Sequence, residues 1–161
     1  MFQPACVLWS YDPSQQSVTG LDVVNHLVAY CDPPYCHTEL AFPSGEACSV
    51  VIGKTVQLRK RGFDERFYTG LVIPSTMEKV QKAREIAARM AEDCVPFGVF
   101  SKTATYCSRL VADILLGSDI ITEKDGSFRG RVTPSGLHRA LDSLPSTFPL
   151  RMPAVEVIDF K

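Results

Sequence analysis

The feature that most constrains the fold is an apolar pattern in the middle of the chain, at about residues 76–94. Apolar side chains recur there at three- and four-residue steps, at Val80, Ala83, Ala87, Met90 and Cys94. This spacing places them on one face of an α-helix. Ser75 and Glu78 match a capping box at its start, and Pro96 and Gly98 follow its end. The pattern therefore predicts a long helix that buries one face against the rest of the chain.

Short segments typical of β-strands surround this helix. Strands are expected at residues 5–9, 37–42, 47–52, 55–59, 67–73 and 154–160. Gly45 supplies the turn of a hairpin between the second and third of these segments. Further helices are expected at residues 21–30, 107–117 and 134–143, with Gly117 as a C-cap of the second and Thr133 as the N-cap of the third. The fold class predicted is α+β, with a small antiparallel sheet in one domain, residues 1–161.

Charge and composition exclude several classes of function. The 161 residues carry a formal net charge of −1, which gives no field that attracts nucleic acid. Neither a signal peptide nor a membrane-spanning run is recognised, so a cytoplasmic location is expected. The six cysteines form no C-x-x-C pair and the three histidines have no metal-binding spacing, so no metal site and no cofactor are expected. The sequence gives no indication of the oligomeric state.

Cys107 is the cysteine best placed to be a nucleophile. It lies at the start of the expected helix 107–117, where the unpaired N–H groups and the helix dipole lower a thiol pKa. Cys94 falls at the opposite end of a helix, where the dipole opposes a thiolate. Cys6 and Cys48 lie in apolar strand segments, where buried thiols are usually inert. Cys107 is therefore the predicted nucleophile, with a buried structural thiol as the alternative.

A cysteine nucleophile needs a histidine within hydrogen-bond reach, and the chain offers three. His26 and His138 fall inside expected helices, where a solvated position explains them. His37 instead opens a strand, from which its ring is able to point toward the end of a helix. His37 is therefore the predicted general base.

The motifs around these two residues resemble a known group of proteins. They are His-x-Glu-Leu opening a hairpin, a glycine eight residues after the histidine, and Tyr-Cys-Ser-x-Leu-Val-Ala-Asp at a helix start. Together they resemble the permuted NlpC-type papain-fold proteins, which include lecithin retinol acyltransferase-like enzymes, small bacterial hydrolases and a small poxvirus protein. Pro96-Phe97-Gly98 also resembles the Pro-Tyr-Gly segment of the poxvirus-type members. The resemblance covers about residues 35–143 and implies a circularly permuted papain-like fold, since the histidine precedes the cysteine.

The resemblance implies catalytic roles for Cys107 and His37 but leaves the third, orienting residue open. In the acyltransferase branch a second histidine lies twelve residues after the first, and Ser49 occupies that position here. Glu39 is expected on the same side of its strand as His37 and is an equal candidate. Tyr106 and Ser108, which flank the cysteine, are expected to bind the substrate.

The expected chemistry is attack of a Cys107 thiolate on a carbonyl carbon, followed by an acyl-enzyme thioester. A peptide or other amide is the first expectation for the substrate, and an acyl ester, as in a lipid acyltransferase or thioesterase, is the second. A non-catalytic module that binds a peptide or acyl chain is the alternative from another class, and redox-active cysteines are a weaker one.

Two further segments receive an interpretation from their position alone. Arg59-Lys60-Arg61, together with Arg66, is interpreted as a solvated turn between strands. Residues 118–133 are interpreted as a loop that follows the nucleophile helix and covers the site.

Overall fold

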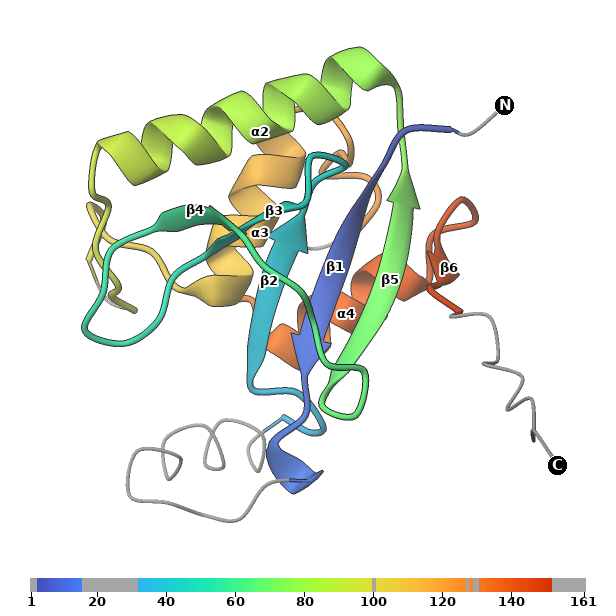
Figure 1. Cartoon of the computed structure of the whole chain (residues 1–161), viewed down its shortest axis with the longest axis horizontal. Helices are drawn as coiled ribbons and strands as arrows, with labels where there is room; N and C mark the ends of the chain where they lie inside the picture. The colour runs from blue at the N-terminus through green and yellow to red at the C-terminus, as the bar shows by residue number, and fades with distance from the viewer. Residues whose placement is uncertain (1–2, 16–31, 100, 127, 129–130, 152–161) are drawn as a thin grey trace, which may run out of the picture.

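The computed structural model describes residues 3–15, 32–99, 101–126, 128 and 131–151, and within them the chain is an α+β protein. The strands are β1 (Ala5–Tyr11), β2 (His37–Ala41), β3 (Glu46–Ser49), β4 (Gln57–Lys60), β5 (Tyr68–Pro74) and β6 (Phe148–Pro149). They form one sheet in the order β4-β3-β2-β1-β5-β6, and all of its pairs are antiparallel. The expected α+β class and small antiparallel sheet are therefore confirmed (Figure 1).

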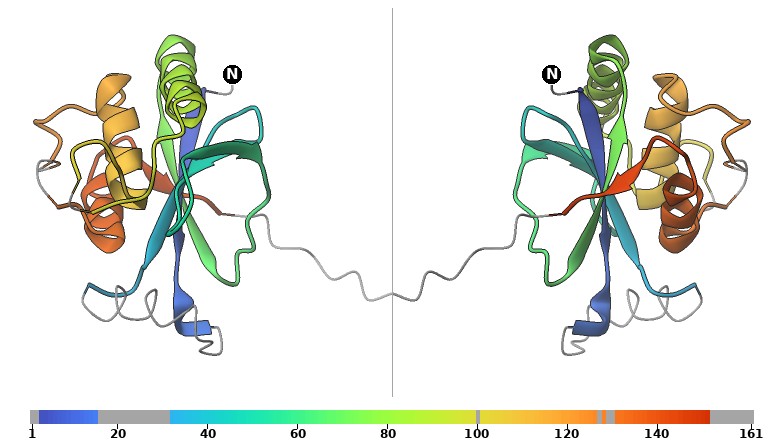
Figure 2. Two further views of the ribbon diagram at one scale, coloured as in Figure 1. Left: turned by 90° about the vertical axis from the view of Figure 1, so that its left-hand side faces the viewer. Right: turned by 90° about the vertical axis from the view of Figure 1, so that its right-hand side faces the viewer.

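Three α-helices lie in the described part of the chain: α2 (Met77–Glu92), α3 (Cys107–Gly117) and α4 (Pro134–Asp142). A short 3-10 helix, η1 (Pro13–Gln15), follows β1. Helix α3 packs on β2 and β3, α4 packs on β1 and β5, and α2 packs on α3 and β4. Figure 2 shows α3 and α4 on the same side of the twisted sheet.

The two faces of the sheet have different roles. On the helix face, alternate residues such as Cys6 and Leu8 of β1 are fully buried against α3 and α4. The opposite face carries Trp9 and Tyr11, which pair with Glu39 and His37 of β2. The connection from β4 to β5 crosses this second face (Figures 1 and 2), and its Phe63 ring stacks on Trp9 with 4.8 Å between centroids. The second face is thus covered by a loop rather than by a helix.

The helix boundaries confirm most of the sequence expectations and correct three details. Thr133 caps α4 as expected, by accepting a hydrogen bond from the Gly136 N–H. The N-cap of α2 is Thr76 and not Ser75, since the Thr76 side chain accepts from the Lys79 N–H. The helix ends at Glu92, so Cys94 lies beyond it with a positive φ of 50°. The C-cap of α3 is Ser118 rather than Gly117.

The strand expectations are corrected mainly at residues 50–52. Strand β3 ends at Ser49, because the chain then turns, with the Lys54 N–H donating to the Val51 carbonyl and Gly53 at φ 76°. The Gly45 turn of the hairpin is confirmed by its φ of 84°. Strand β6 was not expected. The expected helix 21–30 and the expected strand 154–160 lie outside the described residues.

The described residues contain neither a membrane-spanning helix nor a cluster of metal ligands. None of the helices there has the length and apolar character needed to cross a bilayer. The same residues contain no cluster of three or more histidine, cysteine or acidic side chains suited to a metal ion.

Candidate active site

The first turn of α3 presents Cys107 at the N-terminus of the helix. Tyr106 is the N-cap with extended backbone, and Cys107 is the first helical residue. The helix then buries Leu110, Val111, Ile114 and Leu115, which anchor it in the core. Because the first N–H groups of a helix have no partner within it, Cys107 lies in a region of positive potential. The expected placement of this residue is confirmed.

Cys107 and His37 form a hydrogen-bonded pair between α3 and β2. Burial by itself raises the pKa of the Cys107 thiol, but the hydrogen bond and charge of His37 lower that pKa below its ordinary value. Burial likewise lowers the pKa of His37, but the hydrogen bonds and charges of Cys107 and Glu39 outweigh it and raise the pKa to about 9. The pair is therefore a thiolate and an imidazolium from the lowered pKa of Cys107 up to about pH 9.

Backbone groups from two elements also stabilise the thiolate. The N–H groups of Thr38 and Ser108 bond to the Cys107 sulfur and contribute to its lowered pKa. The Thr38 N–H is available because β2 and β3 pair only at Leu40 with Cys48 and at Ala41 with Ala47, so Thr38 lies beyond the last pair. The point at which β3 leaves β2 is thus the point at which the nucleophile is held.

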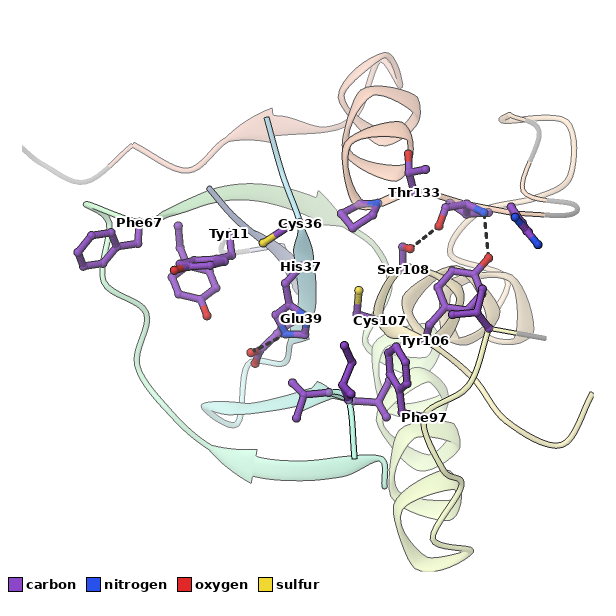
Figure 3. Close-up of a pocket in the computed structure, with 18 of the residues that line it drawn as sticks. Tyr11, Cys36, His37, Glu39, Phe67, Phe97, Tyr106, Cys107, Ser108 and Thr133 are labelled. Carbon is purple, nitrogen blue, oxygen red and sulfur yellow. Dashed lines mark hydrogen bonds and ion pairs between the residues drawn. The ribbon is translucent and has the colours of Figure 1, made fainter. Parts of the chain in front are cut away.

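Glu39 lies on the other side of the imidazole from Cys107 (Figure 3). Its Oε1 is 3.1 Å from His37 Nε2, and the residue is 1% exposed. With Nε2 engaged by the carboxylate, Nδ1 is the ring nitrogen left for Cys107. The side chains of Cys107, His37 and Glu39 therefore follow one another as thiol, imidazole and carboxylate, which is the order that a nucleophile, a base and an orienting acid require.

Ser49 is the other candidate for the orienting position, and the structure does not bring it to His37 in the same way. It is the last residue of β3, where it pairs with Gln57, and it is buried. It is absent from the described residues that line the cavity around Cys107. The geometry therefore favours Glu39.

Arg61 completes this cluster and was missed by the sequence analysis, which interpreted it as part of a solvated turn. Its Nη1 donates to Glu39 Oε1 at 2.7 Å, and its Nη2 donates to the Tyr68 hydroxyl at 3.1 Å. The guanidinium lies 4.7 Å from the centroid of the Phe63 ring. The interpretation as a solvated turn holds better for Arg66, because its partner Asp64 is partly exposed and lies two residues away. Nothing in the local sequence distinguishes the two arginines, because Arg61 meets Glu39 only in the folded sheet.

A cavity of about 920 Å³ opens in front of Cys107 and His37. This volume is at the upper end of those that hold small-molecule ligands. One wall is aliphatic and aromatic, and consists of Val50, Val51, Ile52, Phe97 and Val99. The lining also includes the aromatic side chains Tyr11, Phe67 and Tyr68, and Figure 3 shows Tyr11 and Phe67 across His37 from Phe97. The lining also includes the charged side chains of Arg61 and Arg131, but most of it is apolar, so the cavity suits a ligand with an apolar body.

Tyr106 and Ser108, the expected substrate-binding residues, both border the cavity and both hold the segment before α4. The Tyr106 hydroxyl accepts from the Val132 N–H at 3.0 Å. The Ser108 hydroxyl donates to the Val132 carbonyl oxygen, and Ser108 is fully buried. The Tyr106 ring remains part of the wall, whereas the proton of Ser108 is used within the protein. Val132 and Thr133, at the end of the loop 118–133, line the cavity.

The other cysteines and histidines that the structure describes lie in different surroundings; Cys31 is not among the described residues. Burial raises the pKa of Cys6 and of Cys48 to about 12, which suits inert core thiols. Cys94 is exposed, and Cys36 borders the cavity beside His37. His138 is not solvated as expected, because its Nδ1 lies 2.8 Å from the Ser10 hydroxyl on the helix face. His26 lies outside the described residues.

The two candidates for the orienting residue predict different mutant behaviour. Glu39→Gln keeps the shape but removes the charge beside His37 Nε2, so it is expected to slow alkylation of Cys107 at pH 6 by roughly tenfold. Ser49→Ala is expected to change the rate less than about twofold. Peptide mass spectrometry after timed iodoacetamide labelling measures both rates. The opposite ranking of the two variants contradicts the assignment of Glu39.

Comparison of the chain with protein-family models, with characterised proteins and with solved structures finds no match.

Proposed function

We propose that this protein is a cysteine hydrolase on a circularly permuted papain-like fold, with Cys107 as nucleophile, His37 as base and Glu39 as the orienting residue. One observation carries the proposal. A thiol with a lowered pKa, at the N-terminus of a buried helix, is hydrogen-bonded to a histidine with a raised pKa and faces a large cavity. Structural cysteines such as Cys6 have raised pKa values and no such partner.

In the proposed mechanism the Cys107 thiolate attacks the carbonyl carbon of the substrate and forms a tetrahedral intermediate. The backbone N–H of Cys107 and a neighbouring donor bind the oxyanion at the start of α3. The imidazolium of His37 then protonates the leaving group, which departs and leaves a thioester on Cys107. His37, now neutral, deprotonates a water molecule that attacks the thioester, and the acid product leaves. Glu39 keeps the proton on Nε2 throughout, so that Nδ1 exchanges the proton with the reacting groups.

The substrate proposed first is a peptide or another amide whose acyl part is apolar. The aliphatic wall of the cavity supports an apolar acyl part, because Val51 and Ile52 are 46% and 56% exposed at its rim. The same wall favours a second candidate function, hydrolysis or transfer of the acyl group of an ester or thioester. A catalytic thiol must stay reduced, which suits the cytoplasm.

The test is capture of the acyl-enzyme. Native protein and Cys107→Ser are incubated with matched octanoyl and acetyl compounds, each as an aryl amide, an aryl ester and a thioester, and intact mass is followed with time. The native protein is expected to gain an octanoyl group on the peptide that contains Cys107, faster than an acetyl group. The order of the three leaving groups separates an amidase from an esterase or acyltransferase.

Exposed Cys94 is the internal control for this experiment. If Cys107 acquires no acyl group and reacts with iodoacetamide no faster than Cys94, the hydrolase proposal is overturned. Tight binding of the octanoyl compounds without any covalent product then supports a module that binds acyl chains or peptides.

A further inference from the structure

Arg61 occupies an unusual place for a residue at the end of an edge strand. It follows β4, and its side chain turns inward over the loop-covered face of the sheet. The guanidinium donates to Glu39 and to Tyr68, and it lies 4.7 and 5.5 Å from the ring centroids of Phe63 and Tyr68. Two hydrogen bonds and two aromatic contacts fix its position, which is a geometry that the planar fork of arginine provides and lysine does not.

Glu39 depends on this arginine. The carboxylate is almost completely buried, and removal of a charged group from water is unfavourable unless an opposite charge compensates for it. Its Oε1 receives the Arg61 bond at 2.7 Å and lies 3.1 Å from His37 Nε2, so one oxygen atom links the arginine to the base. Glu39 Oε2 is buried without a hydrogen-bond partner among the described residues. The contacts of Oε1 therefore hold the carboxylate in place.

This link has a chemical consequence for His37. A carboxylate paired with a guanidinium is ionised and only accepts hydrogen bonds, so the proton between it and the imidazole belongs to Nε2. Nδ1 then stays free to exchange a proton with Cys107. The positive charge of Arg61 acts in the opposite direction, since it disfavours the imidazolium. Arg61 thus favours the His37 imidazolium by positioning Glu39 and disfavours it by its own charge. The labelling rate of Cys107 shows which effect is larger.

We infer that Arg61 is a positioning residue of the active site, which holds Glu39 so that His37 keeps the tautomer and orientation needed to activate Cys107. This inference rests on the proposed function. Arg61 acts through Glu39 and makes no contact with Cys107 in the described hydrogen bonds.

The experiment measures the rate of iodoacetamide labelling of Cys107 between pH 5 and 10 in native protein and in Arg61 variants. Arg61→Met keeps much of the apolar bulk but removes the fork, and it is expected to lower the rate at pH 6 by roughly tenfold and to shift the profile to higher pH. Arg61→Lys keeps a charge for Glu39 but loses the contact with Tyr68, so it is expected to recover part of the rate.

Arg66→Met is the matched control, since Arg66 also pairs with a carboxylate and lies 5.3 Å from the centroid of Phe67 but is exposed and distant from Glu39 in the hydrogen-bond network. It is expected to match the native profile. Tyr68→Phe removes only the acceptor of the Arg61 Nη2 bond and is expected to shift the profile in the same direction by a smaller amount. Circular dichroism confirms that each variant is folded.

An unchanged profile in Arg61→Met, or a profile shifted to lower pH with faster labelling at pH 6, overturns the inference, because the charge of Arg61 then outweighs its positioning. If Arg61→Met does not fold, native profiles in both Arg61→Lys and Tyr68→Phe overturn it. Failure of the proposed function gives a different result. In that case Cys107 of the native protein reacts slowly with iodoacetamide at every pH below the pKa of an ordinary thiol.

Discussion

Replacement of His37 by alanine is expected to slow the reaction of Cys107 with iodoacetamide at pH 6 by roughly ten- to a hundredfold. An ordinary thiol is only about 0.3% thiolate at that pH, whereas the lowered pKa of Cys107 gives the paired thiol a larger thiolate fraction. The difference in rate is smaller than the difference in thiolate, because a thiolate of low pKa is a weaker nucleophile. Turnover of any amide or ester substrate is expected to fall further, by about a thousandfold or more, since the base and acid are also lost.

The pH dependence of Cys107 labelling follows from the directions of the two pKa shifts. The raised pKa of His37 means that the imidazolium is present at low pH and is lost as pH rises through about 9. The lowered pKa of Cys107 means that the thiolate is present above that lowered value. Labelling of the native protein is therefore expected to rise at a lower pH than that of His37→Ala, whose labelling rises toward the ordinary thiol pKa.

His138→Ala is the control for this comparison, because His138 contacts Ser10 and Tyr35 rather than the cavity. It is expected to leave the labelling profile of Cys107 unchanged. Equal pH profiles of Cys107 labelling in native protein and in His37→Ala would contradict the assignment of His37.

Replacement of Leu110 by alanine is expected to lower the free energy of unfolding by about 2–5 kcal/mol. Leu110 is fully buried on the face of α3 that packs into the core, one turn after Cys107. Truncation removes apolar contacts and leaves a cavity that the surrounding side chains fill only in part. Since small domains have a total stability of about 5–15 kcal/mol, the loss is a large share of it.

Urea titration followed by circular dichroism measures this change as a lower midpoint with an unchanged slope. Met77→Ala is the matched large-to-small control, because Met77 is 60% exposed at the start of α2. It is expected to change the free energy of unfolding by less than about 0.5 kcal/mol. A Leu110→Ala midpoint equal to that of Met77→Ala would contradict the role of α3 as a core helix.

Local sequence patterns predicted the elements that carry Cys107 and His37, the proposed nucleophile and base. The apolar spacing from Leu110 to Leu115 marks a buried helix, and Cys107 precedes it by less than one turn. His37 was expected to open a strand, and it does. Period and capping are properties of a few neighbouring residues, which is why they are readable without the fold.

The remaining parts of the site depend on contacts between segments distant in sequence. The choice between Ser49 and Glu39 depended on which polar atom reaches His37 Nε2, which a strand pattern does not specify. The inward turn of Arg61 depends on the path of the β4 to β5 connection over the sheet. Residues 50–52 have β-branched side chains typical of strands, yet they leave the sheet, and so they provide a wall of the cavity instead.

Because β3 diverges from β2 at Thr38, the lowered pKa of Cys107 depends on contacts that exist only in the folded chain. The pKa of Cys107 is lowered by His37 and by the Thr38 N–H, which belong to another element and are synthesised before Cys107. A nascent chain or a fragment that lacks the docking of α3 on β2 therefore carries only an ordinary thiol. A reactive Cys107 thiol is therefore expected only after α3 has docked on β2. The fraction of chains that label rapidly at Cys107 then measures the fraction of correctly folded molecules in a mixture.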